Sequence, residues 1–363
     1  MNKQQIRSYT KLLERQRRKT NVPERCYRTQ MKDTGNAVEF DNLQVQFFTD
    51  NGIVKSVDGV SFCVPTGKVV GVVGESGCGK SVTSLALMQL LQRPQGQIVG
   101  GEIRLNLQDK AYDIAKTPEA VMRQLRGSAV SMIFQEPMTA LNPVFTVGRQ
   151  IEEVISFHDR RYATAQEIKN RTLELLELVG IPNPQGVYGM YPHQLSGGMR
   201  QRVMIAIAIA CNPRLVVADE PTTALDVTIQ AQILELLASL RDKLGTAILL
   251  ITHDLGVVAG IADLVVVMYA GRVVEQGTVQ EILSCPAHPY TIGLLASKPV
   301  VGKKTDSLFS IPGSVPDPVN LPKHCYFHSR CSHATQACTG EYPAEIQLSP
   351  THKVSCYKEN THG

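Results

Sequence analysis

The sequence predicts an α/β protein whose core is a parallel sheet flanked by helices, and three features of the chain support this fold class. Short runs of valine, isoleucine and leucine end in an acid or a histidine, as in "RLVVADE" and "AILLITHD", which is typical of buried parallel strands. The stretch "KVVGVVGESGCGKSVTSLALMQLL" indicates a buried strand, a glycine-rich loop and a helix in direct succession. Ahead of it, "VEFDNLQVQFF" and "GVSFCV" look like antiparallel strands. We therefore expect an antiparallel β subdomain beside the parallel core.

Composition divides the chain into three parts. The first 32 residues hold ten Lys or Arg and two Glu, so their net charge is +8. The whole chain has a net charge of +4, which leaves a net charge of −4 for the remaining residues. We expect residues 1–36 to form a basic, flexible extension, with a membrane-surface or partner helix as the alternative. Residues 37–297 are predicted to form the main domain, with a helical subdomain at about 125–192. Pro, Gly, Cys and His then predominate, so residues 298–363 are predicted to form a small cysteine-rich C-terminal extension.

The stretch "GESGCGKS", from Gly74 to Ser81, fits the pattern G-x-x-x-x-G-K-[ST] that cradles phosphate groups. It follows a predicted strand and opens a predicted helix, which is the context that the pattern requires. Its glycines let backbone N–H groups wrap the β- and γ-phosphates at the positive end of the helix. Lys80 adds a point charge, and the Ser81 hydroxyl suits Mg²⁺. We expect the site to be lined by Gly74, Glu75, Ser76, Gly77, Cys78, Gly79, Lys80, Ser81 and Val82.

Polar residues at the ends of three other predicted strands point to the same site. In "RLVVADE", Asp219 reaches the carboxyl end of a strand, where Mg²⁺ would lie, and Glu220 is suited to deprotonate an attacking water. His253 ends "AILLITHD" and would lie beside the phosphate loop if the strands are neighbours. Gln135 closes the strand in "SMIFQEP". Histidine or glutamine at a strand end is a weak signal when taken alone.

A second glycine pair lies more than a hundred residues after the first, in "LSGGMRQR". Ser196 and the N–H groups of Gly197 and Gly198 stand at the start of a predicted helix and would direct its positive dipole at a phosphate. A serine–glycine helix cap is the simpler alternative. One chain thus carries two candidate phosphate cradles far apart in sequence.

Together these motifs resemble those of the ATPase subunits of ABC transporters. In order they are the phosphate loop, the glutamine at Gln135, "LSGGM", "VVADE", "ALD" at Ala224–Asp226 and the histidine at His253. The resemblance implies an ABC-type P-loop nucleotide-binding domain with a RecA-like sheet, which hydrolyses ATP with Mg²⁺. In that family the "LSGGM" loop caps the ATP held by a partner subunit, so that two subunits enclose two ATP molecules head to tail. Two separate cradles in one chain are what such a dimer requires.

The resemblance also implies roles for individual residues. An aromatic side chain before the phosphate loop is expected to stack on adenine, and we assign it to Phe48, with Phe47 as the alternative. Met199 departs from the glutamine that most of the family carries, but no phosphate contact is expected from that side chain. The other expected roles are phosphate binding by Lys80, Mg²⁺ binding by Ser81, Gln135 and Asp219, catalysis by Glu220 with His253 and Gln135, and communication between the two sites by Asp226.

Longer strings narrow the resemblance to the dipeptide and oligopeptide importers, closest to the D-type ATPase of dipeptide permeases. They include "IFQEPMTALNPVFTVGRQI" and "HPYTIGLL", and the resemblance covers about residues 38–358. Nickel and glutathione importers share these strings, so nickel or another small solute remains an alternative cargo. The implied partners are a second ABC ATPase subunit, two transmembrane permease subunits and, indirectly, an extracytoplasmic solute-binding protein. The implied location is peripheral, on the cytoplasmic face of the membrane.

Two features argue against an ABC ATPase that acts on nucleic acid. The chain has no tryptophan and only 6% aromatic residues, too few for a base-stacking platform. It also lacks the long coiled-coil heptads of chromosome and DNA-repair ATPases, and each motif occurs once rather than twice as in translation factors. We therefore expect no nucleic-acid partner.

Four cysteines near the C-terminus suggest a metal site. Cys325, Cys331, Cys338 and Cys356 follow C-x5-C-x6-C-x17-C within 32 residues, which matches a four-thiolate site. The peptide-importer resemblance implies a [4Fe–4S] cluster held by these four thiolates. Zinc and unligated thiols are the alternatives.

Overall fold

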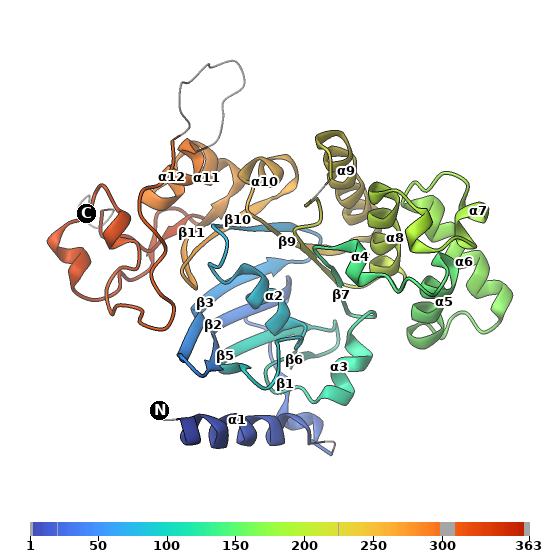
Figure 1. Cartoon of the computed structure of the whole chain (residues 1–363), viewed down its shortest axis with the longest axis horizontal. Helices are drawn as coiled ribbons and strands as arrows, with labels where there is room; N and C mark the ends of the chain where they lie inside the picture. Colours follow the sequence, from blue (N-terminus) through green and yellow to red (C-terminus); the bar gives the residue numbers. More distant parts are fainter. Residues whose placement is uncertain (1–2, 20, 224, 298–308, 359–363) are drawn as a thin grey trace.

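An eight-stranded sheet lies at the centre of the computed structural model, which describes residues 3–19, 21–223, 225–297 and 309–358 (Figure 1). Its strand order is β12-β13-β11-β10-β4-β9-β8-β7, and neighbours from β10 to β7 are parallel. Nearly every residue of these five strands is buried, as the Val/Ile/Leu runs predict. The strands are β4 Val69–Val73, β7 Val130–Ile133, β8 Leu215–Asp219, β9 Ala247–Thr252, β10 Leu264–Tyr269, β11 Arg272–Thr278, β12 Ile346–Gln347 and β13 Lys353–Val354.

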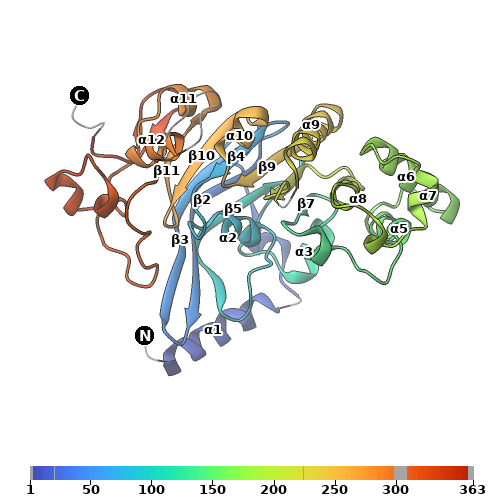
Figure 2. The same ribbon diagram turned by 45° about the horizontal axis from the view of Figure 1, so that its top comes forward.

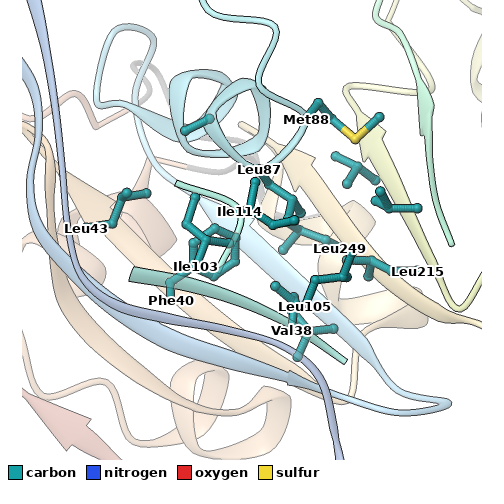
Figure 3. Packing of buried hydrophobic residues seen from close by; sticks show 14 of the residues in the cluster. Val38, Phe40, Leu43, Leu87, Met88, Ile103, Leu105, Ile114, Leu215 and Leu249 are labelled. Atoms are coloured by element: carbon teal, nitrogen blue, oxygen red, sulfur yellow. The ribbon is translucent and has the colours of Figure 1, made fainter. Parts of the chain in front are cut away.

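A five-stranded antiparallel sheet packs below the central sheet in the order β1-β6-β5-β2-β3. One apolar cluster joins the two sheets: Phe40 and Ile103 of the antiparallel sheet lie close to Leu87 of helix α2 and Leu249 of β9 (Figure 3). Burial of this shared core holds the sheets together. The strands are β1 Arg28–Thr29, β2 Asn36–Thr49, β3 Gly52–Pro65, β5 Gly96–Asn106 and β6 Ala111–Asp113.

Helices α5, α6 and α7 form a group at one end of the molecule, with α8 between them and the sheet (Figures 1 and 2). Ile151, Ile155, Leu175 and Leu176 are buried in a cluster that continues through α8 to the central sheet. No helix in the described part of the chain is both long and apolar enough to cross a membrane. The helices after α1 are α2 Lys80–Leu87, α3 Glu119–Leu125, α4 Pro137–Ala140, α5 Val147–His158, α6 Ala165–Leu178, α7 Pro184–Tyr188, α8 Gly197–Ile209, α9 Val227–Leu244, α10 Leu255–Ile261, α11 Val279–Ser284 and α12 Pro289–Ala296, with short 3-10 turns at Glu24–Cys26, Pro192–Gln194, His328–Arg330 and Gln336–Thr339.

The N-terminal segment differs from our expectation of a flexible extension, because Lys3–Arg17 form helix α1. The ring of Tyr9 packs edge-on against Phe48 at 5.6 Å between centroids. Two ion pairs add to this contact, Arg17 with Glu119 at 3.0 Å and Glu14 with Arg93 at 3.3 Å. One face of the helix is thereby attached to the antiparallel sheet and its neighbours. The predicted domain boundaries themselves stay predictions, and the one at residue 298 lies outside the described residues.

The segment 309–358 lies against the outer end of the central sheet. Tyr326 and Phe327 are buried in one apolar cluster with Tyr269 of β10. The Tyr326 hydroxyl donates a hydrogen bond to Oδ2 of Asp58 at 2.6 Å, and Arg272 binds the same oxygen at 2.8 Å. Strand β13 continues the sheet by pairing with β11. Side-chain bonds and strand pairing therefore both join this segment to the core.

A buried histidine, His288, gives the fold an expected pH dependence. Its Nδ1 accepts a hydrogen bond from the Tyr290 backbone N–H at 3.0 Å, and burial lowers the pKa of His288 from 6.5 to about 3. The unfolded chain takes up a proton here near pH 6.5 and the folded chain does not. Keeping His288 neutral therefore stabilises the fold above the pKa of the unfolded chain, 6.5, and this stabilisation is lost as the pH falls toward the pKa of the folded chain, about 3. At about pH 5.5 the free energy of unfolding is lower by about 1.4 kcal/mol.

Thermal unfolding of wild type and of His288→Asn at about pH 7.5 and about pH 5.5 measures this effect. Asparagine cannot titrate but can still cap the helix. We expect acidification to lower the melting temperature of the wild type more than that of the variant. An equal decrease in both proteins would assign the pH dependence to other groups.

Candidate functional site

The phosphate loop Gly74–Gly79 connects β4 to α2 and lies in close contact with neighbouring backbone. A Cβ atom on Gly74 would come within 2.2 Å of the Met268 carbonyl oxygen, and one on Gly79 within 2.4 Å of the Ser56 carbonyl oxygen. Both glycines also have positive φ, +154° and +101°. Only glycine fits at either position, so the backbone at both ends of the loop is held in one conformation. Ser76 and Gly77 are exposed at its tip.

Lys80, the first residue of α2, directs its charge into the loop. Its side chain is buried, and Nζ donates hydrogen bonds to the carbonyl oxygens of Gly74 at 2.8 Å and Glu75 at 3.0 Å. The ammonium group thus lies inside the curve of the loop, at the positive end of the helix dipole. This arrangement is suited to an anionic group with several oxygens.

The next residue, Ser81, connects the loop to the neighbouring strand end. Its hydroxyl donates a hydrogen bond to Oδ1 of Asp219 at 2.9 Å. Burial raises the pKa of Asp219; the Ser81 hydrogen bond opposes this rise and the nearby Glu220 adds to it. A hydroxyl and a carboxylate in contact at the mouth of a phosphate loop are ligands that Mg²⁺ prefers. The pair therefore fits the predicted Mg²⁺ site.

Glu220 receives hydrogen bonds from three side chains. Gln135 Nε2 lies 3.0 Å from Oε2, the Thr223 hydroxyl lies 2.9 Å from the same oxygen, and His253 Nδ1 lies 3.2 Å from Oε1. Since β7, β8 and β9 are adjacent parallel strands, residues that follow each of them meet at one edge of the sheet. Glu220 itself has a φ of +46°, a strained backbone for a side chain of this size.

Thr223 was not among the residues predicted for this site. Its position three residues after Glu220, in "DEPTTALD", was the available signal. The structure shows that its hydroxyl orients the Glu220 carboxylate together with Gln135.

The serine–glycine motif forms a separate surface at the start of α8. Ser196 caps the helix by accepting from the Met199 N–H at 3.4 Å, and Ser196 and Gly197 are exposed. A Cβ on Gly197 would lie 3.6 Å from Leu225, so this loop touches the segment that precedes α9. Asp226, which caps α9, is exposed there as well. Ala224 lies outside the described residues.

Helices α8 and α2 lie apart in both views of the molecule (Figures 1 and 2). The structure brings Lys80, Ser81 and Asp219 together at one place and Gln135, Glu220 and His253 beside them, but it does not add Ser196, Gly197 and Gly198 to that group.

The predicted adenine-stacking residues lie beside helix α1. Phe48 is only 5% exposed because Tyr9 covers it. Phe47 is half-buried and packs against the core cluster. Both rings line a pocket with Ile6 of α1. Which of them stacks on adenine stays a prediction.

The four C-terminal cysteines correct our metal prediction. Among the residues that the structure describes, no group of three or more His, Cys, Asp or Glu is arranged to hold a metal ion. Cys325 and Cys331 pack against one apolar cluster and Cys356 belongs to another. The expected [4Fe–4S] cluster, and a metal-binding role for this segment, are therefore wrong.

The glycine loop with Lys80, the Ser81–Asp219 pair and the glutamate at the next position define a P-loop nucleotide-binding domain. The model of the ABC transporter family matches residues 57–223, and that of the oligopeptide/dipeptide transporter C-terminal region matches residues 274–338. The oligopeptide transport ATP-binding protein AppD of Bacillus subtilis is 50% identical over 320 residues, which cover 88% of this chain and 96% of that protein. The dipeptide transport ATP-binding protein DppD of Escherichia coli is 47% identical over 317 residues, 87% of this chain and 95% of that protein.

Among solved structures, the dimeric ABC transporter cassette MJ0796 matches with a TM-score of 0.59 and 26% identity, covering 67% of this chain and 98% of that one. The chain belongs to the family of ATP-binding subunits of oligopeptide and dipeptide ABC transporters. The predicted ABC-type P-loop fold is confirmed, as is the predicted class of activity, ATP hydrolysis coupled to transport.

Proposed function

We propose that this chain hydrolyses ATP at Glu220 to drive the import of oligopeptides or dipeptides. The observation that supports this most strongly is the arrangement of Gln135, Thr223 and His253 around the Glu220 carboxylate, directly beside the Ser81–Asp219 pair. A carboxylate held from two sides can accept a proton from a water molecule at the γ-phosphate. The peptide cargo rests on what the names of AppD and DppD state, and nickel or another small solute remains the alternative.

Each residue has a distinct task in this proposal. Lys80 and the loop N–H groups hold the β- and γ-phosphates. Ser81, Asp219 and Gln135 would hold Mg²⁺, which neutralises charge on those phosphates when bound. Glu220 is the base, and His253 orients it from the other oxygen while remaining within reach of the γ-phosphate.

The exposed serine–glycine motif requires a second ATPase subunit in this proposal. Ser196 and the N–H groups of Gly197 and Gly198 would cap an ATP molecule that a partner subunit holds, and Asp226 beside them would contact that partner. The exposure of Ser196, Gly197 and Asp226 supports this arrangement, and so does the likeness to a cassette solved as a dimer.

Permease subunits would dock between the sheet and helices α4 to α7. Large apolar side chains are exposed there, among them Phe134 at 40%, Met138 at 57% and Val144 at 70%. The Met190 carbonyl oxygen accepts the Val147 N–H at 2.8 Å, so that the exposed Met190 lies beside the same loop. An apolar surface of this kind suits membrane-protein loops. The chain would then lie on the cytoplasmic face of the membrane, and a solute-binding protein would act on the far side.

Gly197→Asp tests the two-subunit arrangement. The position is exposed, a Cβ there meets only Leu225 at an ordinary 3.6 Å, and an acid in the first turn of a helix does not oppose folding. We expect ATP binding to a single chain to be unchanged, while ATP hydrolysis by the assembled transporter falls at least about a hundredfold, because the carboxylate would repel the partner's γ-phosphate.

Gly197→Ala is the matched control, since it adds a Cβ without charge and should keep most of the activity. ATPase activity of the purified transporter complex and ATP-dependent association of the two ATPase subunits are the measurements. Normal hydrolysis by the Gly197→Asp complex would contradict the proposal that this motif caps a nucleotide.

A further inference from the structure

The C-terminal segment contacts Glu75 of the phosphate loop. The guanidinium of Arg330 forms a bidentate ion pair with the Glu75 carboxylate, with Nη1 2.7 Å from Oε2 and Nη2 3.0 Å from Oε1. The Arg330 side chain is only 4% exposed. Paired, parallel hydrogen bonds of this kind are among the strongest charge-assisted contacts in proteins. Glu75 and Arg330 are 255 positions apart in the chain.

Arg330 is held in place by its own surroundings. Its Nε donates to the Pro312 carbonyl oxygen at 2.9 Å, and its guanidinium lies over the rings of Tyr269 at 5.7 Å and Phe327 at 5.9 Å. The Glu75 carboxylate and, to a smaller extent, the Tyr269 hydroxyl keep the pKa of Arg330 above its usual value, although burial opposes this rise. The arginine is therefore a rigid, permanently charged group.

The backbone N–H of Glu75 also contacts a residue from the C-terminal third of the chain. It donates a hydrogen bond to the Tyr290 hydroxyl at 2.8 Å, and Tyr290 is fully buried at the start of α12. Both the side chain and the amide of Glu75 are thus occupied by residues from the C-terminal third of the chain. Neither group is left to face the inside of the loop, where Lys80 lies.

We propose that Arg330 is a positioning residue of the phosphate loop, which neutralises the Glu75 carboxylate and so sets the affinity of the site for ATP. This inference rests on the proposed function of the loop in binding ATP phosphates. A carboxylate within a phosphate-binding loop repels the triphosphate unless an opposite charge compensates it. Through this contact, the segment that contains residues 309–358 acts on the nucleotide site without touching the nucleotide.

The test compares Arg330→Met with the double variant Arg330→Met/Glu75→Gln in the assembled transporter. We expect Arg330→Met to raise the KM for ATP about tenfold with kcat changed less than about twofold, because only the repulsion between carboxylate and phosphate changes. The double variant should return KM to within about twofold of wild type, since the repelling charge is gone. A purely structural role would not be rescued by Glu75→Gln.

Tyr326→Phe is the matched control. It removes the hydrogen bond to Asp58 of strand β3, which also joins the C-terminal segment to the core but does not involve the Glu75 carboxylate. Its KM should stay within about twofold of wild type. If Arg330→Met fails to fold, Arg330→Lys replaces it in the test. Lysine keeps the positive charge but cannot form the bidentate contact, so we expect the KM for ATP to rise about threefold.

An Arg330 variant that folds and has a normal KM, or a double variant as impaired as Arg330→Met, would overturn this inference. Lys80→Ala distinguishes failure of this inference from failure of the proposed function. If the loop does not bind ATP phosphates, Lys80→Ala leaves ATP binding intact. Loss of binding in Lys80→Ala together with a normal KM in Arg330→Met would refute the inference alone.

Discussion

Replacing Glu220 with glutamine is expected to lower ATP hydrolysis at least about a hundredfold and to leave ATP binding within about twofold of wild type. Glutamine has the same shape and can keep a hydrogen bond with Thr223, but it cannot accept a proton from water. Ser81 and Asp219 are unchanged, so the groups that hold phosphate and Mg²⁺ stay in place. Steady-state ATPase activity and binding of a fluorescent ATP analogue measure the two quantities separately.

Glu235→Gln is the matched control, because Glu235 lies on the exposed side of α9 and should tolerate the same chemical change without effect. Normal turnover in Glu220→Gln would remove Glu220 as the base. Loss of ATP binding in that variant would instead assign the residue to the binding site.

Replacing Lys80 with alanine is expected to weaken ATP binding at least about thirtyfold, the largest change expected in ATP binding itself. The ammonium group is buried, and the Gly74 and Glu75 carbonyl oxygens direct it into the loop. Removing it takes away the positive charge closest to the β- and γ-phosphates, and the remaining N–H groups and helix dipole supply only part of the attraction. Titration with a fluorescent ATP analogue measures the dissociation constant.

Lys68→Ala provides the control for loss of one lysine. Lys68 is mostly exposed and pairs with Asp263 at 3.1 Å, a surface ion pair that contributes little. Its ATP affinity should equal that of wild type. If Lys80→Ala bound ATP as tightly as wild type, the assignment of the phosphate site would be wrong. The two variants are expected to differ, because Glu220→Gln should bind ATP and hydrolyse it slowly.

Local patterns predicted which side chains lie together beside the phosphate loop. The glycine loop follows a strand of five buried residues and opens a helix, because the apolar run and the helix start are both encoded within a few residues. Asp219 and Glu220 were expected beside that loop, since carboxyl ends of parallel strands meet at one edge of the sheet. The Ser81–Asp219 hydrogen bond and the position of Gln135 next to Glu220 agree with that reasoning.

Contacts between distant parts of the chain were not predictable in this way. The helix Lys3–Arg17 looked like a solvated basic tail, yet Tyr9 covers Phe48, and Glu14 and Arg17 form ion pairs with the main domain. The cysteine spacing suggested a metal site, but in the described part of the chain no group of three or more His, Cys, Asp or Glu is arranged to hold a metal ion. Spacing along a chain does not determine which way side chains point in a segment with little regular structure.

The amino-acid sequence by itself determined the phosphate loop, the acidic strand end and the order of the motifs, because each depends on neighbouring residues and on short-range backbone preferences. Only the tertiary structure decided that Thr223 and His253 bind opposite oxygens of Glu220, and that Arg330 reaches across 255 positions to Glu75. Those contacts depend on how sheets, helices and the C-terminal segment pack. Packing is set by the burial of the whole core and cannot be read from any one stretch of sequence.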